Sequence, residues 1–220
     1  PHRVYEYGTG VEAGKDIDAV RVPAFLPDTE IVRNDILDYL LEIEHFDSHL
    51  FQMISFLKEK GELDNTFIVV TADNGMPFPY AKANLQEFGT HVPLAISMPN
   101  NIISKKQVHE PVGLIDIAPT ILELVNLSGS IATTGKSLMP ILTQEDHPKH
   151  REFVLTGRER HTHARPDNLG YPARAIRTED FLYVYNFDPD RWPVGYPVPK
   201  NPENDKRNSV SGFKGLYPGY

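Results

Sequence analysis

A run of apolar and β-favouring residues, from Phe67 to Ala72, ends in an acid, an amide and a glycine at Asp73, Asn74 and Gly75. Such a run predicts a buried strand of an α/β sheet. Ligands of open α/β sheets bind outside the carboxyl ends of the strands, and this is where Asp73 and Asn74 would lie. A carboxylate and an amide carbonyl are the hard oxygen ligands that Ca²⁺ or Mg²⁺ prefers. We therefore expect a metal site at this strand end, with Asp73 and Asn74 as ligands.

The rest of the first 150 residues predicts further parts of an α/β domain. Apolar residues recur at three- and four-residue steps between about residues 30 and 60, which predicts a long helix capped by Asp28 or Thr29. A second short buried strand is expected over 92–99. A helix that is apolar around much of its surface, and therefore buried, is expected over about 116–125, with Asp116 as its N-cap.

The pattern changes from residue 151 onward. Segments 152–156, 173–177 and 181–185 are short and alternating, which predicts a small antiparallel sheet. We therefore expect two parts: residues 1–150, with an α/β mixed sheet flanked by helices, and residues 151–220, with the small sheet and a tail rich in Pro, Gly and aromatic residues.

Composition excludes several classes of function. The chain has 220 residues and a formal net charge of −8, which argues against a nucleic-acid partner for the chain as a whole. It has no cysteine, so disulfides, thiolate zinc sites and cysteine nucleophiles are excluded. No apolar run approaches the roughly 20 residues that span a bilayer. The opening at Pro1, without Met or a signal peptide, indicates a piece of a longer chain.

Histidines and lysines provide weaker signals. His45 and His49 have a spacing that can bind metal on a helix, but two solvated histidines are the preferred interpretation. His91 either faces the site or caps the second strand. His2, on local grounds, is an exposed loop residue. Lys82 follows Asp73 by nine residues, so it is either an ordinary exposed lysine or a point charge that binds an anion beside the metal.

A local reversal of charge occurs after residue 157. The segment 158–168 carries Arg158, His161, His163 and Arg165 in an otherwise acidic protein. Arginine forks and histidines in such a loop favour contact with an anionic substrate. The alternative is a surface loop neutralised by nearby carboxylates. The segment from Gly135 to Ser137 lacks the spacing of a phosphate loop, so we reject that interpretation.

Four stretches together resemble the sulfatases of the alkaline phosphatase superfamily. They are the helix end at 60–66, the strand and ligand pair at 69–75, the segment at 89–94, and the segments at 116–120 and 135–138. The residues after Gly75 and the opening Pro1-His2-Arg3 are most similar to the N-sulfoglucosamine sulfohydrolase (heparan N-sulfatase) branch. The resemblance implies an alkaline-phosphatase-like fold.

The resemblance also implies individual roles. Asp73 and Asn74 match the second pair of Ca²⁺ ligands of the family, with Mg²⁺ as the alternative ion. Lys82 matches the basic residue that binds the sulfate oxygens. His2 matches an active-site histidine that faces the sulfate or its leaving group. The loop from Arg158 to Arg165 falls where the C-terminal subdomain helps to form the substrate pocket.

One departure from the family affects activity. Sulfatases use a formylglycine made from Cys or Ser in a C/S-x-P-x-R motif, and this chain contains neither Cys nor S-x-P-x-R. We expect the nucleophile and an upstream pair of Asp ligands in a missing N-terminal half, and we expect this chain alone to be inactive.

The resemblance implies that the intact protein hydrolyses sulfate esters or N-sulfates, of sulfated sugars of the heparan type or of another small sulfate ester. It also implies export to the periplasm, the cell exterior or the lysosome. The alternatives are a phosphoesterase or phosphonate hydrolase of the same superfamily, and a non-catalytic protein that binds sulfated sugar.

Overall fold

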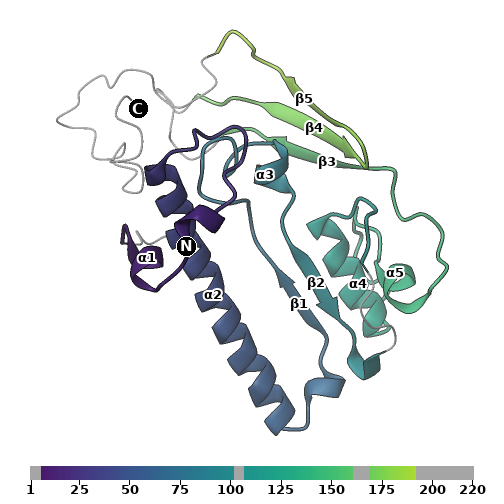
Figure 1. Cartoon of the computed structure of the whole chain (residues 1–220). Helices are drawn as coiled ribbons and strands as arrows, with labels where there is room; N and C mark the ends of the chain where they lie inside the picture. Colours follow the sequence, from purple (N-terminus) through teal and green to yellow (C-terminus); the bar gives the residue numbers. More distant parts are fainter. Residues whose placement is uncertain (1–5, 102–106, 161–168, 192–220) are drawn as a thin grey trace. The chain divides into compact units, whose positions relative to one another are not determined.

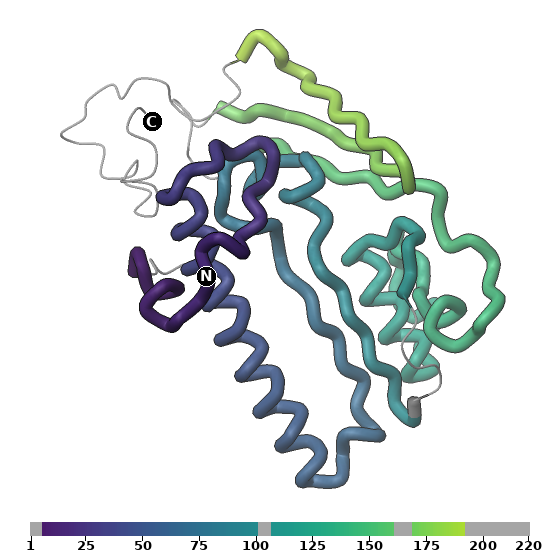
Figure 2. The backbone as a smooth tube through the Cα atoms, in the orientation of Figure 1, coloured from purple at the N-terminus to yellow at the C-terminus, as the bar shows by residue number. Residues whose placement is uncertain are grey.

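A computed structural model describes residues 6–101, 107–160 and 169–191 (Figure 1). The chain divides into two compact units: the described residues up to Gly61 form one, and those from Glu62 onward form the other. Figure 2 traces the backbone of each unit in the same orientation. Among the described residues, no helix is both long enough and apolar enough to cross a membrane.

The first unit is organised on one long helix. It contains α1 (Thr9–Glu12), the short 3₁₀ helix η1 (Ile17–Ala19) and α2 (Glu30–Glu59). The Thr29 side chain caps α2 by accepting a hydrogen bond of 3.3 Å from the Val32 backbone N–H. Just past the helix end, Gly61 has the left-handed φ of +70° that favours glycine at this position. The predicted helix and its cap are therefore confirmed.

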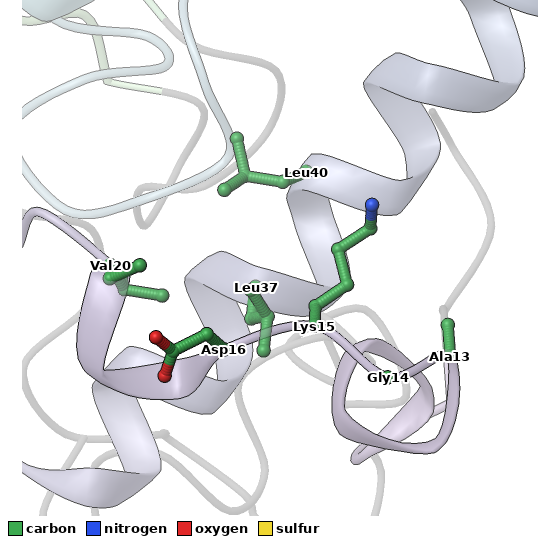
Figure 3. A pocket seen from close by; sticks show the side chains of 8 residues that line it. Ala13, Gly14, Lys15, Asp16, Val20, Leu37 and Leu40 are labelled. Carbon is green, nitrogen blue, oxygen red and sulfur yellow. The ribbon is translucent and has the colours of Figure 1, made fainter.

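A buried carboxylate joins α1 to α2. Asp38 is 1% exposed, and it accepts hydrogen bonds from the backbone N–H groups of Gly8 (2.8 Å) and Gly10 (2.7 Å). The backbone of α1 approaches α2 so closely that a Cβ on Gly10 would lie 2.7 Å from Leu37 Cγ. Beside this contact lies a small open pocket of about 270 Å³, which Lys15 and Asp16 line together with Leu37 and Leu40 of α2 (Figure 3).

Only the first part of α2 is buried. Its buried residues run from Val32 to Asp38, whereas Leu40 is 39% exposed and Phe51 is 70% exposed. Asp47 of α2 is exposed as well, so its carboxylate faces solvent. The burial of the first part of α2 arises because α1 and η1 pack on this helix within the first unit.

The second unit begins with a pair of strands. β1 (Ile68–Thr71) and β2 (Leu94–Ser97) pair antiparallel, with Ile68 opposite Ser97 and Thr71 opposite Leu94. The two predicted strands are therefore present, but the expectation that they are buried was wrong. All four residues of β1 are half-buried, and those of β2 alternate between half-buried and exposed. In the described part of the chain the pair has no third strand beside it.

Short helices lie before, between and after these two strands. They are η2 (Leu63–Asn65) before β1, then α3 (Glu87–Thr90), η3 (Pro99–Asn101), η4 (Leu114–Asp116), α4 (Ile117–Leu124) and α5 (Met139–Thr143). The predicted helix near residues 116–125 is confirmed as η4 and α4, but its predicted burial was wrong. Thr120 is the buried residue of α4, whereas Ile121 is 41% exposed and Val125 is 53% exposed.

A three-stranded antiparallel sheet completes the second unit, as predicted. Its order is β3 (Phe153–Arg158), β4 (Ala173–Thr178) and β5 (Leu182–Asn186). One face packs on Leu85, which forms a buried cluster with Ala173 and Ala175. The division of the chain near residue 150 remains a prediction, and most of the predicted tail lies outside the described residues.

The link between α1 and α2 is testable. Replacing Asp38 with Ala leaves the N–H groups of Gly8 and Gly10 without their acceptor, which costs about 1–3 kcal/mol for a buried donor. We expect the free energy of unfolding in urea to fall by about that amount. The exposed Asp47→Ala on the same helix is the control, and it should change this free energy by no more than about 0.5 kcal/mol. Equal effects of the two substitutions would contradict the role of Asp38.

Candidate active site

The predicted ligand pair lies directly after β1. The strand ends at Thr71, and Asp73 is exposed while Asn74 is half-buried. Within the described residues, the Asp73 carboxylate makes no hydrogen bond or ion pair. Its oxygens are therefore available to a ligand, as a metal-binding carboxylate requires.

Residues 75–89, here called the site loop, return the chain to the end of β1. The Gly75 N–H donates to the Gly89 carbonyl at 3.1 Å, which closes the loop. A Cβ on Gly75 would lie 1.8 Å from the Phe88 carbonyl oxygen, and one on Gly89 would lie 2.4 Å from the Ala81 carbonyl oxygen. Both positions require glycine because the backbone segments leave no room for a side chain.

Lys82 lies in the middle of the site loop and is tied back to its start. Its backbone N–H donates to the Met76 carbonyl at 3.0 Å, three residues after Asp73. Tyr80 and Ala83 have positive φ values of 60° and 64°, and such strained conformations gather at functional sites. Within the described residues, the Lys82 ammonium has no ion-pair partner. The loop thus brings the backbone of Lys82 close to that of the ligand pair.

Arg158, a predicted substrate-binding residue, lies against the same loop. Its guanidinium donates to the Ala83 carbonyl and lies 5.8 Å from the centre of the Tyr171 ring. Burial lowers the pKa of Arg158 below its ordinary value. The structure therefore places Arg158 in contact with Ala83, the residue that follows Lys82 in the sequence. His2, His161, His163 and Arg165 lie outside the described residues, so their predicted roles remain predictions.

The donor set at Asp73 and Asn74 fits part of a Ca²⁺ or Mg²⁺ shell. Both residues offer oxygen, the atom these ions prefer, and Ca²⁺ takes about six to eight such ligands. Among the described residues there is no group of three or more His, Cys, Asp or Glu that could hold a metal ion. The pair can therefore supply two ligands, and the remaining ligands must come from other residues or from water.

A broad groove of about 1540 Å³ in the second unit has Asp73 among its lining residues. The groove also takes in His91, Glu87 and Arg177. The His91 ring lies 2.7 Å from the Glu87 carboxylate through Nδ1, and Glu87 accepts two hydrogen bonds from Arg177, of 2.9 and 3.2 Å. His91 thus follows α3 and lines the groove that Asp73 also lines, and it does not cap β2, which begins at Leu94.

The sequence patterns did not predict the Glu87–Arg177 pair, although the alternation of residues along β4 indicates it. Alternate residues of a strand share a face, so Arg177 lies on the same face as the buried Ala173 and Ala175. An arginine on a core-facing row needs a hydrogen-bond acceptor, which an acidic side chain can supply. Hydrogen bonding to Arg177, followed by that to His91, outweighs burial and lowers the pKa of Glu87.

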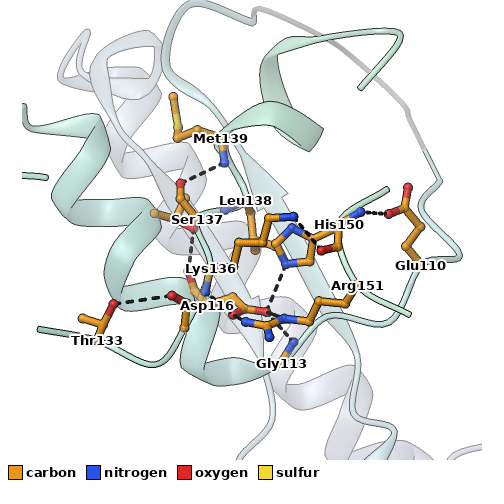
Figure 4. A network of polar contacts seen from close by, with 12 residues as sticks. Glu110, Gly113, Asp116, Thr133, Lys136, Ser137, Leu138, Met139, His150 and Arg151 are labelled. Atoms are coloured by element: carbon orange, nitrogen blue, oxygen red, sulfur yellow. Dashed lines mark hydrogen bonds and ion pairs between the residues drawn. The ribbon is translucent and has the colours of Figure 1, made fainter. Parts of the chain in front are cut away.

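A second polar network lies around Asp116, which is fully buried (Figure 4). Its carboxylate accepts hydrogen bonds from the N–H groups of Gly113 (2.9 Å) and Lys136 (2.7 Å), and it binds His150 and Arg151. The predicted N-cap position is confirmed, because Asp116 directly precedes α4, but its side chain makes no capping hydrogen bond to that helix. The carboxylate instead joins α4 to the segments around Lys136 and Arg151.

The other candidates have structural partners or lie in solvent. His45 and His49 are exposed on α2 with their ring centres 4.3 Å apart, as the preferred interpretation predicts. The Lys136 ammonium donates to the His150 carbonyl at 2.7 Å, so it serves the Asp116 network. This contact agrees with rejecting a phosphate loop at residues 135–137.

An α/β unit with an acid and an amide directly after a strand, Lys82 in the site loop and a small C-terminal sheet agrees with the family that the sequence resembles. The family model described as Sulfatase matches residues 4–127, and the chain therefore belongs to the sulfatase family. Its later part matches the model described as N-sulphoglucosamine sulphohydrolase, C-terminal, over residues 79–210.

Similar proteins agree with this assignment. The chain is 31% identical over 179 residues to the human N-sulphoglucosamine sulphohydrolase, covering 77% of this chain and 34% of that protein. It is 25% identical to an ulvan-active sulfatase of Formosa agariphila, covering 81% of this chain and 28% of that protein. The chain thus spans about a third of the length of these relatives.

Solved structures show the same fold. A protein described as a 2-O GAG sulfatase matches with a TM-score of 0.59 at 20% identity, covering 70% of this chain and 35% of that one. A protein solved in complex with its substrate, D-glucosamine-2-N,6-O-disulfate, matches with a TM-score of 0.54 at 24% identity, covering 73% of this chain and 32% of that one. The predicted sulfatase-like α/β fold with a small antiparallel sheet is confirmed.

The Asp116 network predicts a dependence of stability on pH. Burial alone would raise the pKa of Asp116, but hydrogen bonds from Arg151, Gly113, Lys136 and His150 together hold it below its ordinary value of 3.8. A carboxyl with a lowered folded pKa stabilises the protein above its unfolded pKa, and this contribution is lost as pH falls through the folded pKa.

We therefore expect Asp116→Asn to lower the free energy of unfolding by about 3 kcal/mol at neutral pH, because Arg151 loses its buried partner. The difference from wild type should stay constant above about pH 5 and shrink below about pH 4. Urea unfolding across this range measures it, with the exposed Asp64→Asn as control. A difference that is independent of pH would contradict the assignment of the charge to Asp116.

Proposed function

We propose that the full-length protein containing this chain hydrolyses sulfate esters or N-sulfates of sulfated sugars, with Asp73, Asn74 and Lys82 in its active site. The observation that carries the proposal is the closed site loop. It returns the backbone of Lys82 to Met76, beside an exposed carboxylate at the end of β1. The names of the relatives support the substrate class, since one is an N-sulphoglucosamine sulphohydrolase and another is an ulvan-active sulfatase.

Asp73 and Asn74 would hold a divalent cation, Ca²⁺ in this proposal and Mg²⁺ as the alternative. Such an ion neutralises charge on a bound sulfate and polarises its oxygens. In this chain the contribution of the pair is position: both residues follow the end of β1, and the closed loop at Gly75 limits where they can move.

Lys82 is suited to bind the sulfuryl oxygens. A lysine ammonium is a compact point charge with three donors, and in the described residues this one is not engaged by a carboxylate. Charge on the sulfuryl oxygens is best stabilised by donors that are already in place before reaction. The backbone of Lys82 forms hydrogen bonds with the Met76 carbonyl and with the Asn84 side chain, and these bonds fix the backbone from which the ammonium extends.

The remaining parts are proposed from the family resemblance. His2 would assist the leaving amine or alcohol by proton transfer. Arg158, His161, His163 and Arg165 would contact the anionic sugar. The formylglycine nucleophile and the other metal ligands would come from a segment outside this chain, so the chain alone would be inactive, and the intact protein would be exported.

The proposal predicts that Asp73→Ala, made in the full-length enzyme, removes Ca²⁺ binding together with activity, because a ligand carboxylate is lost. Isothermal titration with Ca²⁺ and an assay of sulfate release measure the two effects. The exposed Asp64→Ala is the matched control and should retain both. Unchanged Ca²⁺ affinity in Asp73→Ala would overturn the ligand assignment.

Lys82→Ala in the same enzyme should lower kcat by about 100- to 1000-fold, the range found when one donor to a developing charge is removed. Its Ca²⁺ affinity should be retained, because Lys82 is not a ligand. Lys82→Arg keeps the positive charge and should recover part of kcat. If Lys82→Ala leaves kcat unchanged, the lysine is an ordinary surface residue.

Substrate class is tested on the full-length wild type with three substrates of similar size. Release of sulfate from a sulfate ester or an N-sulfated glucosamine supports the proposal. Faster hydrolysis of a phosphate monoester would favour the phosphoesterase alternative, and binding of sulfated sugar without turnover would favour the non-catalytic one.

A further inference from the structure

The three-stranded sheet contacts the site loop at three alternate residues, Ala83, Leu85 and Glu87. Arg158 of β3 donates to the Ala83 carbonyl. Leu85 packs with Ala173 and Ala175 of β4. Glu87 binds Arg177 of β4. We call these three interactions, at loop positions 83, 85 and 87, the sheet–loop contact.

All sheet residues of the sheet–loop contact lie on one face. Ala173, Ala175 and Arg177 are alternate residues of β4, so their side chains point the same way. Arg158 pairs directly with Ala173 in the ladder between β3 and β4, and paired residues share a face. The face is shaped for the loop: two small alanines accept the larger Leu85, and an arginine lies on each side of them.

The Glu87–Arg177 pair is the polar end of this contact. Arg177 donates from two nitrogens to Glu87, at 2.9 and 3.2 Å, across 90 positions of sequence. It also donates to the Glu179 carbonyl at 2.9 Å, which orients the guanidinium. Two parallel hydrogen bonds fix direction as well as distance, so they position Glu87 more tightly than a single charge contact would.

The site loop links the fixed position of Glu87 to Lys82. Glu87 begins α3, and α3 leads to Gly89, whose carbonyl closes the loop on Gly75. Four residues, 83 to 86, lie between Lys82 and Glu87, and two of them, Ala83 and Leu85, contact the sheet themselves. Lys82 therefore lies next to a segment with three separate attachments to the sheet.

We propose that Glu87 and Arg177 are positioning residues, which hold the site loop on the C-terminal sheet so that Lys82 meets the anion bound beside Asp73 and Asn74. This inference rests on the proposed function for the role of Lys82. It gives the C-terminal sheet a part in catalysis that needs no contact with the substrate.

The size of the effect should distinguish positioning from stability. The Glu87 and Arg177 side chains are 40% and 31% exposed, and ion pairs of this exposure contribute little to the free energy of unfolding. A misplacement of about 1 Å in an active site, by contrast, can lower the rate by about 100-fold. Loss of the pair should therefore lower kcat while the midpoint of urea unfolding stays the same.

The test uses the full-length enzyme with Arg177→Gln, Glu87→Gln and the control Arg174→Gln. Arg174 is the neighbouring arginine of β4, points to the other face and pairs with Glu159, which is not in the site loop. We expect Arg177→Gln and Glu87→Gln to lower kcat by about 10- to 100-fold with a smaller change in KM. Arg174→Gln should leave both near the wild-type values.

A double variant shows whether the pair acts through Lys82. If it does, Lys82→Ala combined with Arg177→Gln should be no slower than Lys82→Ala alone, since the positioned group is already absent. If the loss of kcat in the double variant equals the product of the losses in the two single variants, the proposal is overturned. Equal effects of Arg177→Gln and Arg174→Gln would overturn it as well.

Amide hydrogen exchange tests the contact without any assay of activity. The N–H groups of Lys82 and Gly75 are bonded within the site loop, and they should exchange faster in Arg177→Gln than in wild type or in Arg174→Gln. If wild type releases no sulfate but the two N–H groups exchange faster in Arg177→Gln than in the other two proteins, the proposed function fails and the positioning of the loop stands. Equal exchange in all three proteins overturns the positioning role whatever the activity.

Discussion

The close approach of the backbone at Gly75 and Gly89 is the constraint on which the candidate active site depends. Gly75 donates to the Gly89 carbonyl, and neither residue has space for a Cβ. Because the two glycines meet, the residues between them must form a closed loop beside the end of β1. Asp73 and Asn74 precede this closure and Lys82 lies within the loop, so the closure places the three backbones in one region.

The small sheet completes this arrangement from the far end of the sequence. Its inner face presents two small alanines, with an arginine on each side of them, to loop residues 83 to 87. The Asp116 network performs a separate, structural task, because it joins α4 to the segment that enters β3. Two buried carboxylates, Asp38 in the first unit and Asp116 in the second, thus hold the framework around elements that are short or only half-buried.

The elements themselves could be predicted from local patterns. The spacing of apolar residues predicted α2, with Asp28 or Thr29 as its cap, and alternation predicted β3, β4 and β5. Burial could not be predicted in the same way. The apolar surfaces of β1, α4 and the later part of α2 are partly exposed, because periodicity records which face is apolar but not what covers it. Asp116 shows the same limit: its position suggested a cap, whereas its partners beyond the nearby Gly113 include Lys136 and Arg151, 20 and 35 residues away.

The sequence alone determined the identity of the chemical groups and the family. An acid and an amide after an apolar run, a lysine nine residues later and four motifs in order indicate a sulfatase, because these features are local and need no knowledge of packing. Only the tertiary structure decided how the groups are held. The pairing of Glu87 with Arg177, and of Arg158 with the Ala83 carbonyl, joins residues 90 and 75 positions apart. Such contacts follow from the way strands and loops pack in space.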